Sequence, residues 1–124
     1  MLKWRCVLIV EDEVLVAHEL AVAVAEAEGV AIGPVHTVEE ALAVLEREWI
    51  DAAILDVQLD GKAVTPVAKA LLDQGGVVVF HAASPAPEDI VRDYADVAVC
   101  PKPTLPNVVV RRLIETLDAA GRTP

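Results

Sequence analysis

Four charged residues of this sequence stand at, or within two residues of, the end of a short apolar run: Glu11, Asp12, Asp56 and Lys102. Two carboxylates held ~4 Å apart repel each other by about 4 kcal/mol at an effective dielectric constant of about 20, so a cluster of carboxylates shifts its pKa values or binds a cation. Magnesium prefers oxygen ligands and commonly binds carboxylates together with phosphate oxygens. These residue types therefore predict a magnesium and phosphoryl site, in which Lys102 supplies a second positive charge for the phosphoryl oxygens.

Asp56 is the acid best placed to act as a nucleophile. A carboxylate can attack a phosphoryl group and form an aspartyl-phosphate. Asp56 directly follows an apolar run and precedes the turn-like segment Gln58-Leu59-Asp60-Gly61, which opens space around it. Any one of these acids taken alone is better explained as a solvated loop residue. The joint placement of four charged residues at strand ends favours the site.

Short apolar runs alternate with segments of helical spacing along the chain. The runs are uninterrupted and rich in β-branched residues, which predicts buried strands of a parallel sheet, at Cys6–Val10, Val30–Val35, Ala52–Leu55, Val77–Phe80 and Val97–Cys100. Helices are predicted between and after them, at Val14–Glu28, Val38–Glu48, Ala63–Gln74, Glu88–Tyr94 and Leu105–Ala119. Thr37 and Glu40 form a capping-box pattern that marks the start of the second helix.

This alternation predicts an α/β fold in which a parallel sheet carries helices on both faces through right-handed crossovers. Ligands of such folds bind at the carboxyl ends of the strands, near the point where the strand order reverses. The four charged residues are therefore expected on one edge of the sheet. The chain has 124 residues, which fits one domain, and no linker to an output domain is recognisable. Residues 1–124 are thus expected to form a single domain.

Composition narrows the classes of protein. Hydrophobic residues make up 55% of the chain and aromatic residues 3%, so we expect a packed core built from Ala, Val, Leu and Ile. The net charge of −10 disfavours binding to nucleic acid or to an anionic membrane. No stretch approaches the roughly 20 apolar residues of a membrane span, and the first residues contain no signal peptide. A cytoplasmic protein is therefore expected.

Other reactive side chains form no recognisable site. Cys6 and Cys100 lie in apolar runs and are interpreted as reduced core thiols. His18, His36 and His81 share no metal-ligand spacing and are interpreted as ordinary histidines. The sequence contains no Gly-rich phosphate loop, nucleophile elbow or dinucleotide fingerprint, which argues against the common enzymes of small α/β domains.

The sequence resembles the receiver domains of response regulators along nearly its whole length. Three segments carry the resemblance: Val7-Leu8-Ile9-Val10-Glu11-Asp12-Glu13, Ile54-Leu55-Asp56-Val57-Gln58-Leu59-Asp60-Gly61 and Pro101-Lys102-Pro103. The resemblance implies a flavodoxin-like, doubly wound (βα)5 sandwich of three layers with the parallel strand order 2-1-3-4-5. It also implies a bacterial two-component phosphorelay protein that transmits a signal and is not an enzyme.

Roles for individual residues follow from the resemblance. Asp56 is implied as the phospho-acceptor, and Asp12, Asp56 and the backbone carbonyl of Gln58 are implied as ligands of Mg²⁺, with Glu11 nearby through water. Lys102 is implied to contact the phosphoryl group. The implied partners are a sensor histidine kinase or phosphotransfer protein and a downstream protein target. Family members also form homodimers through the fourth and fifth helices, a matter that this sequence leaves open.

The last two strands both match and depart from the family pattern. The resemblance implies a cis peptide bond at Lys102–Pro103. Receivers carry Thr or Ser where Ala82 stands, and an aromatic switch residue where Val99 stands. Losing one hydroxyl contact to a charged group removes about 1.5–3 kcal/mol of the force that distinguishes the phosphorylated state, so we predict a weakened or rewired switch. Ser84 is interpreted as a loop serine that at most modulates it.

Three interpretations stay open, in order of preference. The first is a stand-alone response regulator that signals by protein contact or phosphate relay; residues 56–68 are similar to single-domain receivers of alphaproteobacterial stress and light signalling. The second is a degenerate receiver that binds proteins independently of phosphorylation, which Ala82 and Val99 motivate. The third is a metal-dependent phosphatase or hydrolase with the same carboxylates, for which the sequence offers no general acid.

Overall fold

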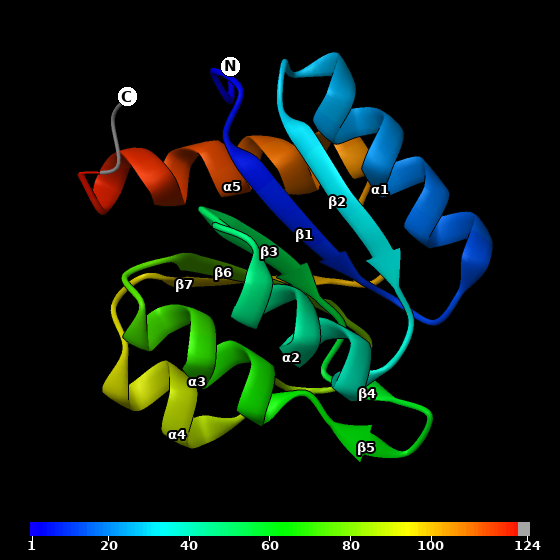
Figure 1. The fold of residues 1–124 in the computed structure, drawn as a ribbon, viewed down its shortest axis with the longest axis vertical. Coiled ribbons are helices and arrows are strands. Elements are labelled where there is room, and N and C mark those ends of the chain that lie inside the picture. Colours follow the sequence, from blue (N-terminus) through cyan, green and yellow to red (C-terminus); the bar gives the residue numbers. More distant parts are fainter. Residues whose placement is uncertain (122–124) are drawn as a thin grey trace.

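The computed structural model of the protein describes residues 1–121 and contains a five-stranded parallel sheet (Figure 1). The strands are β1 (Cys6–Val10), β2 (Val30–Val35), β3 (Ala52–Leu55), β6 (Val77–Ala82) and β7 (Val97–Pro101). They lie in the order β2-β1-β3-β6-β7, which confirms the predicted doubly wound topology. The order reverses beside β1, so ligand sites are expected where β1 and β3 end.

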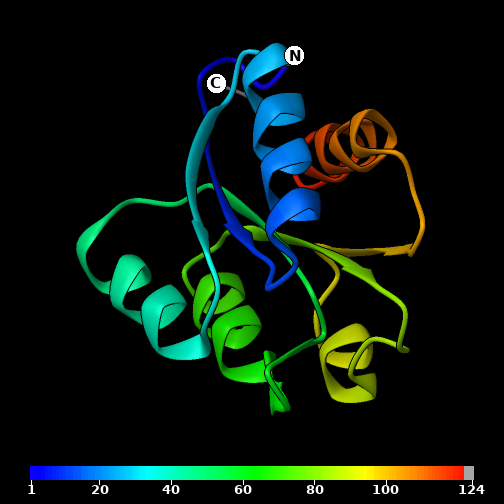
Figure 2. The same cartoon turned by 90° about the vertical axis from the view of Figure 1, so that its right-hand side faces the viewer.

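Two layers of helices cover the sheet (Figure 2). The first layer contains α1 (Val14–Glu26) and α5 (Pro106–Ala119), and the second contains α2 (Val38–Arg47), α3 (Thr65–Asp73) and α4 (Glu88–Asp93). Successive residues of a strand point to opposite faces, so β6 gives Val79 to the core under the first layer and Phe80 to the core under the second. Phe80 is fully buried, and the expectation of a purely aliphatic core is wrong at this position.

The sequence prediction lacks one element, a hairpin that follows β3. Its strands β4 (Gln58–Leu59) and β5 (Lys62–Ala63) flank the turn Asp60-Gly61, in which both residues have positive φ angles. The hairpin includes Ala63, so α3 begins at Thr65 and not at Ala63 as predicted. The other predicted bounds differ from the structure by at most two residues. No helix within residues 1–121 has both the length and the hydropathy of a membrane span.

Candidate metal and phosphoryl site

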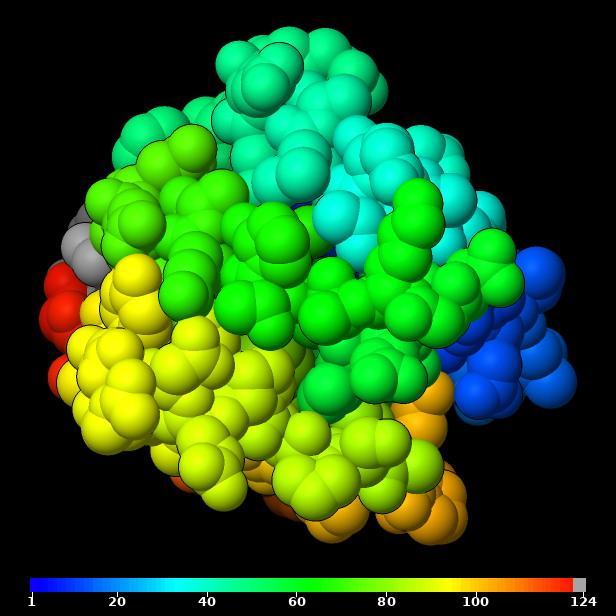
Figure 3. All heavy atoms as spheres, turned by 90° about the horizontal axis from the view of Figure 1, so that it is seen from below, coloured from blue at the N-terminus to red at the C-terminus, as the bar shows by residue number. Residues whose placement is uncertain are grey.

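The predicted site residues lie together at the carboxyl edge of the sheet. Backbone hydrogen bonds continue the strand pairing past the strand ends, since Asp56 N donates to Val10 O at 3.1 Å and Lys102 N donates to Ala82 O at 3.0 Å. Figure 3 views the molecule from this side, where the start of α1 (blue), the hairpin (green), the loop after β6 (yellow-green) and the segment before α5 (orange) form one surface. The sheet thus fixes the backbone that carries the site.

Three carboxylates meet at this edge. One oxygen from each of Glu11, Asp12 and Asp56 lies within 4.8 Å of the other two. Glu11 is buried, Asp12 is exposed and Asp56 is partly buried, so the cluster reaches from the interior to the surface. Oxygen donors of this kind suit a hard divalent cation. Gln58 lies two residues beyond Asp56, at the start of β4, and the role of its backbone carbonyl stays a prediction.

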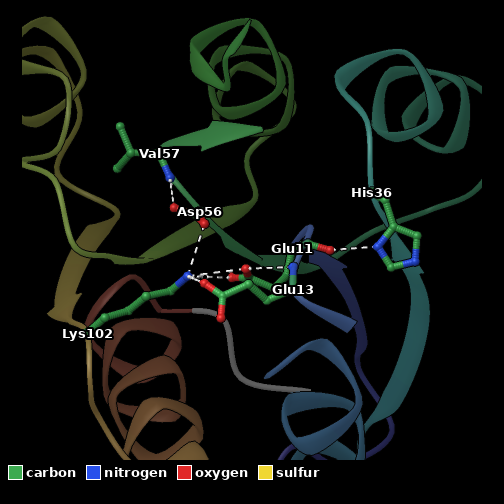
Figure 4. A network of polar contacts seen from close by, with 6 residues as sticks. All are labelled: Glu11, Glu13, His36, Asp56, Val57 and Lys102. Carbon is green, nitrogen blue, oxygen red and sulfur yellow. Dashed lines mark hydrogen bonds and ion pairs between the residues drawn. The ribbon is translucent and has the colours of Figure 1, made fainter. Parts of the chain in front are cut away.

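Lys102 is the cationic partner of the cluster (Figure 4). Its Nζ lies 3.0 Å from Asp56 Oδ2, 3.1 Å from Glu11 Oε2 and 3.4 Å from Glu13 Oε1. Burial favours the neutral amine, but the hydrogen bonds to Asp56 and Glu11 outweigh this effect and raise the pKa of Lys102 above its ordinary value. Lys102 therefore remains a cation throughout the physiological pH range.

Glu11 is the most buried acid of the cluster, with 1% of its side chain exposed. Burial raises the pKa of Glu11 to about 6, although hydrogen bonds from Lys102 and from the backbone N of Glu13 oppose this shift. Glu13 N donates to Glu11 Oε1 at 3.2 Å. The three carboxylates of the cluster outnumber the one ammonium group of Lys102, so the donor set fits a divalent cation.

Asp56 is held by both of its carboxylate oxygens. Oδ1 accepts a hydrogen bond from Val57 N at 2.7 Å, and Oδ2 accepts one from Lys102 Nζ at 3.0 Å (Figure 4). The side chain keeps 15% of its surface exposed, which leaves it reachable from solvent. This acid therefore combines a fixed orientation with access, as a nucleophile requires.

Two residues at the site were missed by sequence reasoning. Glu13 forms an ion pair with Lys102. It is the third acid of the run Glu11-Asp12-Glu13, and this position in the sequence could have identified it. His36 Nδ1 donates to the backbone carbonyl oxygen of Glu11 at 2.7 Å (Figure 4). Nothing in the spacing of His36 marks this contact.

The predicted switch positions lie around β6 and β7. Ala82 is the buried last residue of β6, so no hydroxyl group stands at that strand end. Val99 is 44% exposed on β7, which lies at the edge of the sheet. Ser84 is exposed in the loop after β6, and the Lys102–Pro103 peptide bond is cis. The response of these positions to phosphate stays a prediction.

A cavity of about 550 Å³ lies beside the site, between α1 and the segment that precedes α5. Lys102 and His81 are among the residues that line it. His81 is 4% exposed, and within residues 1–121 neither of its ring nitrogens has a hydrogen-bond partner. Burial lowers the pKa of His81, so the ring is neutral at pH 7.

No protein-family model and no curated protein matches this chain. Solved structures do match. SdrG from Sphingomonas melonis Fr1 is 36% identical, with 94% of this chain and 98% of SdrG covered and a TM-score of 0.75. The response regulator PhyR from Brucella abortus is 26% identical, with 96% of this chain and 51% of PhyR covered and a TM-score of 0.74.

A more distant structure supports the same fold. A CheY-like response regulator receiver domain protein from Methanospirillum hungatei JF-1 is 24% identical over 96% of this chain and 98% of its own, with a TM-score of 0.80. The fold, the acidic edge of the sheet and the similarity to SdrG over nearly its full length all indicate the same family. The chain belongs to the receiver domains of response regulators.

Proposed function

We propose that this protein accepts a phosphoryl group on Asp56 in a magnesium-dependent reaction, from a histidine kinase or a phosphotransfer protein, with residues 1–124 acting as one domain. The observation that carries the proposal is the contact of Lys102 Nζ with Asp56 Oδ2 at 3.0 Å beside three convergent carboxylates. A nucleophilic carboxylate, a fixed ammonium group and a cation site are the parts that phosphoryl transfer needs.

Glu11, Asp12 and Asp56, with the backbone carbonyl of Gln58, are the groups that would hold Mg²⁺. When bound, the ion would neutralise charge on the attacking carboxylate and on the phosphoryl oxygens. Mg²⁺ and the Lys102 ammonium group would then together balance the negative charge of the phosphorylated site, because Lys102 stays protonated. The convergence of three acids and one lysine supports this assignment.

Asp56 carries out the transfer. One carboxylate oxygen forms a bond to phosphorus, and the bond between phosphorus and the imidazole nitrogen of the donor breaks, with its electron pair left on that nitrogen. The hydrogen bond from Val57 N to Oδ1 limits rotation of the carboxylate, so the attack starts from one orientation. Lys102 Nζ would pair with the incoming phosphoryl oxygens.

The output is proposed to be protein contact or phosphate relay, with a weakened switch. Ala82 offers no hydroxyl to the phosphoryl group, Val99 has no ring to move, and Ser84 lies exposed in the next loop. Ala82 and Val99 also favour a second candidate function, a degenerate receiver that is not phosphorylated and binds its partner independently of phosphate. The two candidates differ in whether Asp56 is phosphorylated at all.

Intact-protein mass separates these candidates. The protein is incubated with acetyl phosphate, with and without Mg²⁺, alongside Asp56→Asn and the matched control Asp60→Asn. Asp60 is an exposed acid of the hairpin turn with a φ of 49°, a conformation that Asn tolerates. A gain of one phosphoryl group that requires Mg²⁺ and Asp56, but not Asp60, is expected. No gain, together with no binding of beryllofluoride, would favour the phosphate-independent module.

A further inference from the structure

Both backbone polar groups of Glu11 are held by consecutive residues at the end of β2. Glu11 N donates to Val35 O at 3.1 Å. His36 Nδ1 donates to Glu11 O at 2.7 Å, and Figure 4 shows the imidazole ring directed at this carbonyl. The contact requires a proton on Nδ1, because a carbonyl oxygen only accepts. The residue that begins the acidic cluster is therefore fixed on either side of its Cα.

An extra residue in β2 brings His36 to this position. Leu8 pairs with Ile32, but Val10 pairs with Val35, so β2 contains one more residue than β1 over this stretch. Gly33 makes the irregularity possible, since its φ is +92° and a Cβ there would lie 2.7 Å from the N of Val35. A regular register would place Val35 opposite Glu11; the bulge places His36 there instead.

The backbone that carries His36 has little freedom to move. Only His36 and Thr37 separate β2 from α2. Thr37 caps the helix, because its Oγ1 accepts a hydrogen bond from Glu40 N at 3.1 Å, which confirms the predicted capping pattern. The backbone of His36 is thus held between a paired strand end and a capped helix. The His36 side chain itself is exposed and contributes little to the core.

We propose that His36 is a positioning residue for the divalent-cation site, an inference that rests on the proposed function. The carbonyl of Glu11 belongs to the peptide plane shared with Asp12, so holding this oxygen sets the ψ angle of Glu11 and the φ angle of Asp12. These angles decide where both carboxylates point. Magnesium demands near-ideal geometry, so a rotation of this plane weakens binding without removing any ligand.

Two substitutions separate the hydrogen bond from the bulk of the ring. Asn carries an amide N–H at the same bond distance from the backbone as Nδ1 of His, whereas Phe keeps a ring and lacks the donor. Mg²⁺ affinity is measured by isothermal titration calorimetry on the full chain, for the natural protein, His36→Asn and His36→Phe. His18→Phe is the matched control, since His18 is an exposed histidine of α1.

The expected result is that His36→Phe weakens Mg²⁺ binding by about ten-fold or more, while the affinities of His36→Asn and His18→Phe stay close to that of the natural protein. Equal affinity in His36→Phe would overturn the inference and leave the proposed function intact. Equal loss in His36→Phe and His36→Asn would also overturn it, because the ring and not the donor would then matter. No Mg²⁺ binding by the natural protein would overturn the metal part of the proposed function and the inference with it.

A spectrum of the natural protein gives an answer that does not depend on any variant folding. The chain has three histidines, and two-bond ¹⁵N–¹H correlations report which ring nitrogen of each carries the proton. The inference requires a protonated Nδ1 on His36. A neutral His36 ring with its proton on Nε2 would contradict it.

Discussion

His81 is a buried polar residue whose ring nitrogens have no hydrogen-bond partner within residues 1–121. A polar group left in this state costs about 1–3 kcal/mol, and replacing it by an apolar group of similar shape is neutral or stabilising. The adjoining cavity gives a slightly larger ring room to settle. We therefore predict that His81 reduces the stability of the natural protein.

His81→Phe is expected to raise the free energy of unfolding by about 1 kcal/mol at pH 7, measured by urea denaturation. Burial lowers the pKa of His81 in the folded state below its ordinary value of 6.5, so as the pH falls past 6.5 the unfolded chain binds a proton at this position more readily than the folded chain does. The natural protein therefore loses stability on acidification through this group, and the loss begins as the pH falls through 6.5. The advantage of the variant should therefore widen as the pH falls from 7 towards 5.

The control for this prediction is His18→Phe on the exposed surface of α1. Its stability at pH 7 should differ little from that of the natural protein, because the ring is exposed. A loss of stability in His81→Phe at pH 7 would mean that the histidine ring makes a favourable contact, contrary to the prediction.

The helices and strands that show a continuous hydrophobic pattern could be predicted from the sequence. β3 is an apolar run in which all four residues are buried, and strand ends place the site acids on one edge. The hairpin could not be predicted, because strands of two residues are too short to show a period. The contact of His36 could not be predicted either, since it depends on the extra residue in β2 and on the paired register.

The interface between α3 and α4 offers a direct spectroscopic test of the element packing. Tyr94 follows α4 and donates its hydroxyl hydrogen bond to Asp73 Oδ1, at the end of α3, at 2.6 Å. This hydrogen bond, with smaller contributions from burial and nearby acids, raises the pKa of Tyr94. The chain contains one tyrosine, so the phenolate absorbance of the protein reports the ionisation of Tyr94 alone.

Titration of the folded protein is expected to show Tyr94 ionising above the ordinary pKa of about 10, and Asp73→Asn should move it back towards that value. Because the folded-state pKa is raised, the stability that the contact contributes is present below pH 10 and is lost as the pH rises through the folded-state value. An unchanged titration curve in Asp73→Asn would show that the two helices are not joined by this bond in solution.

At the scale of the whole molecule, phosphorylation of Asp56 matters only if it changes the conformation of distant elements such as α4 and β7. A ligand shifts a conformational equilibrium only by the difference in its interactions with the two states. Ala82 lies at the end of β6, next to Lys102 through a backbone hydrogen bond of 3.0 Å, and adds no side-chain contact to a phosphoryl group. The backbone hydrogen bond between these strand ends and the absent hydroxyl together predict that phosphorylation acts locally and propagates weakly to α4 and β7.

Ala82→Thr is expected to extend the response, because a hydrogen bond to a charged group contributes about 1.5–3 kcal/mol, which is about ten-fold or more in the equilibrium. Amide chemical shifts are compared with and without beryllofluoride and Mg²⁺. In the natural protein the changes should stay near Asp56 and Lys102, whereas in Ala82→Thr they should reach α4. Ser84→Ala should behave like the natural protein. Changes of equal extent in the natural protein would mean that the signal travels by contacts other than this hydroxyl.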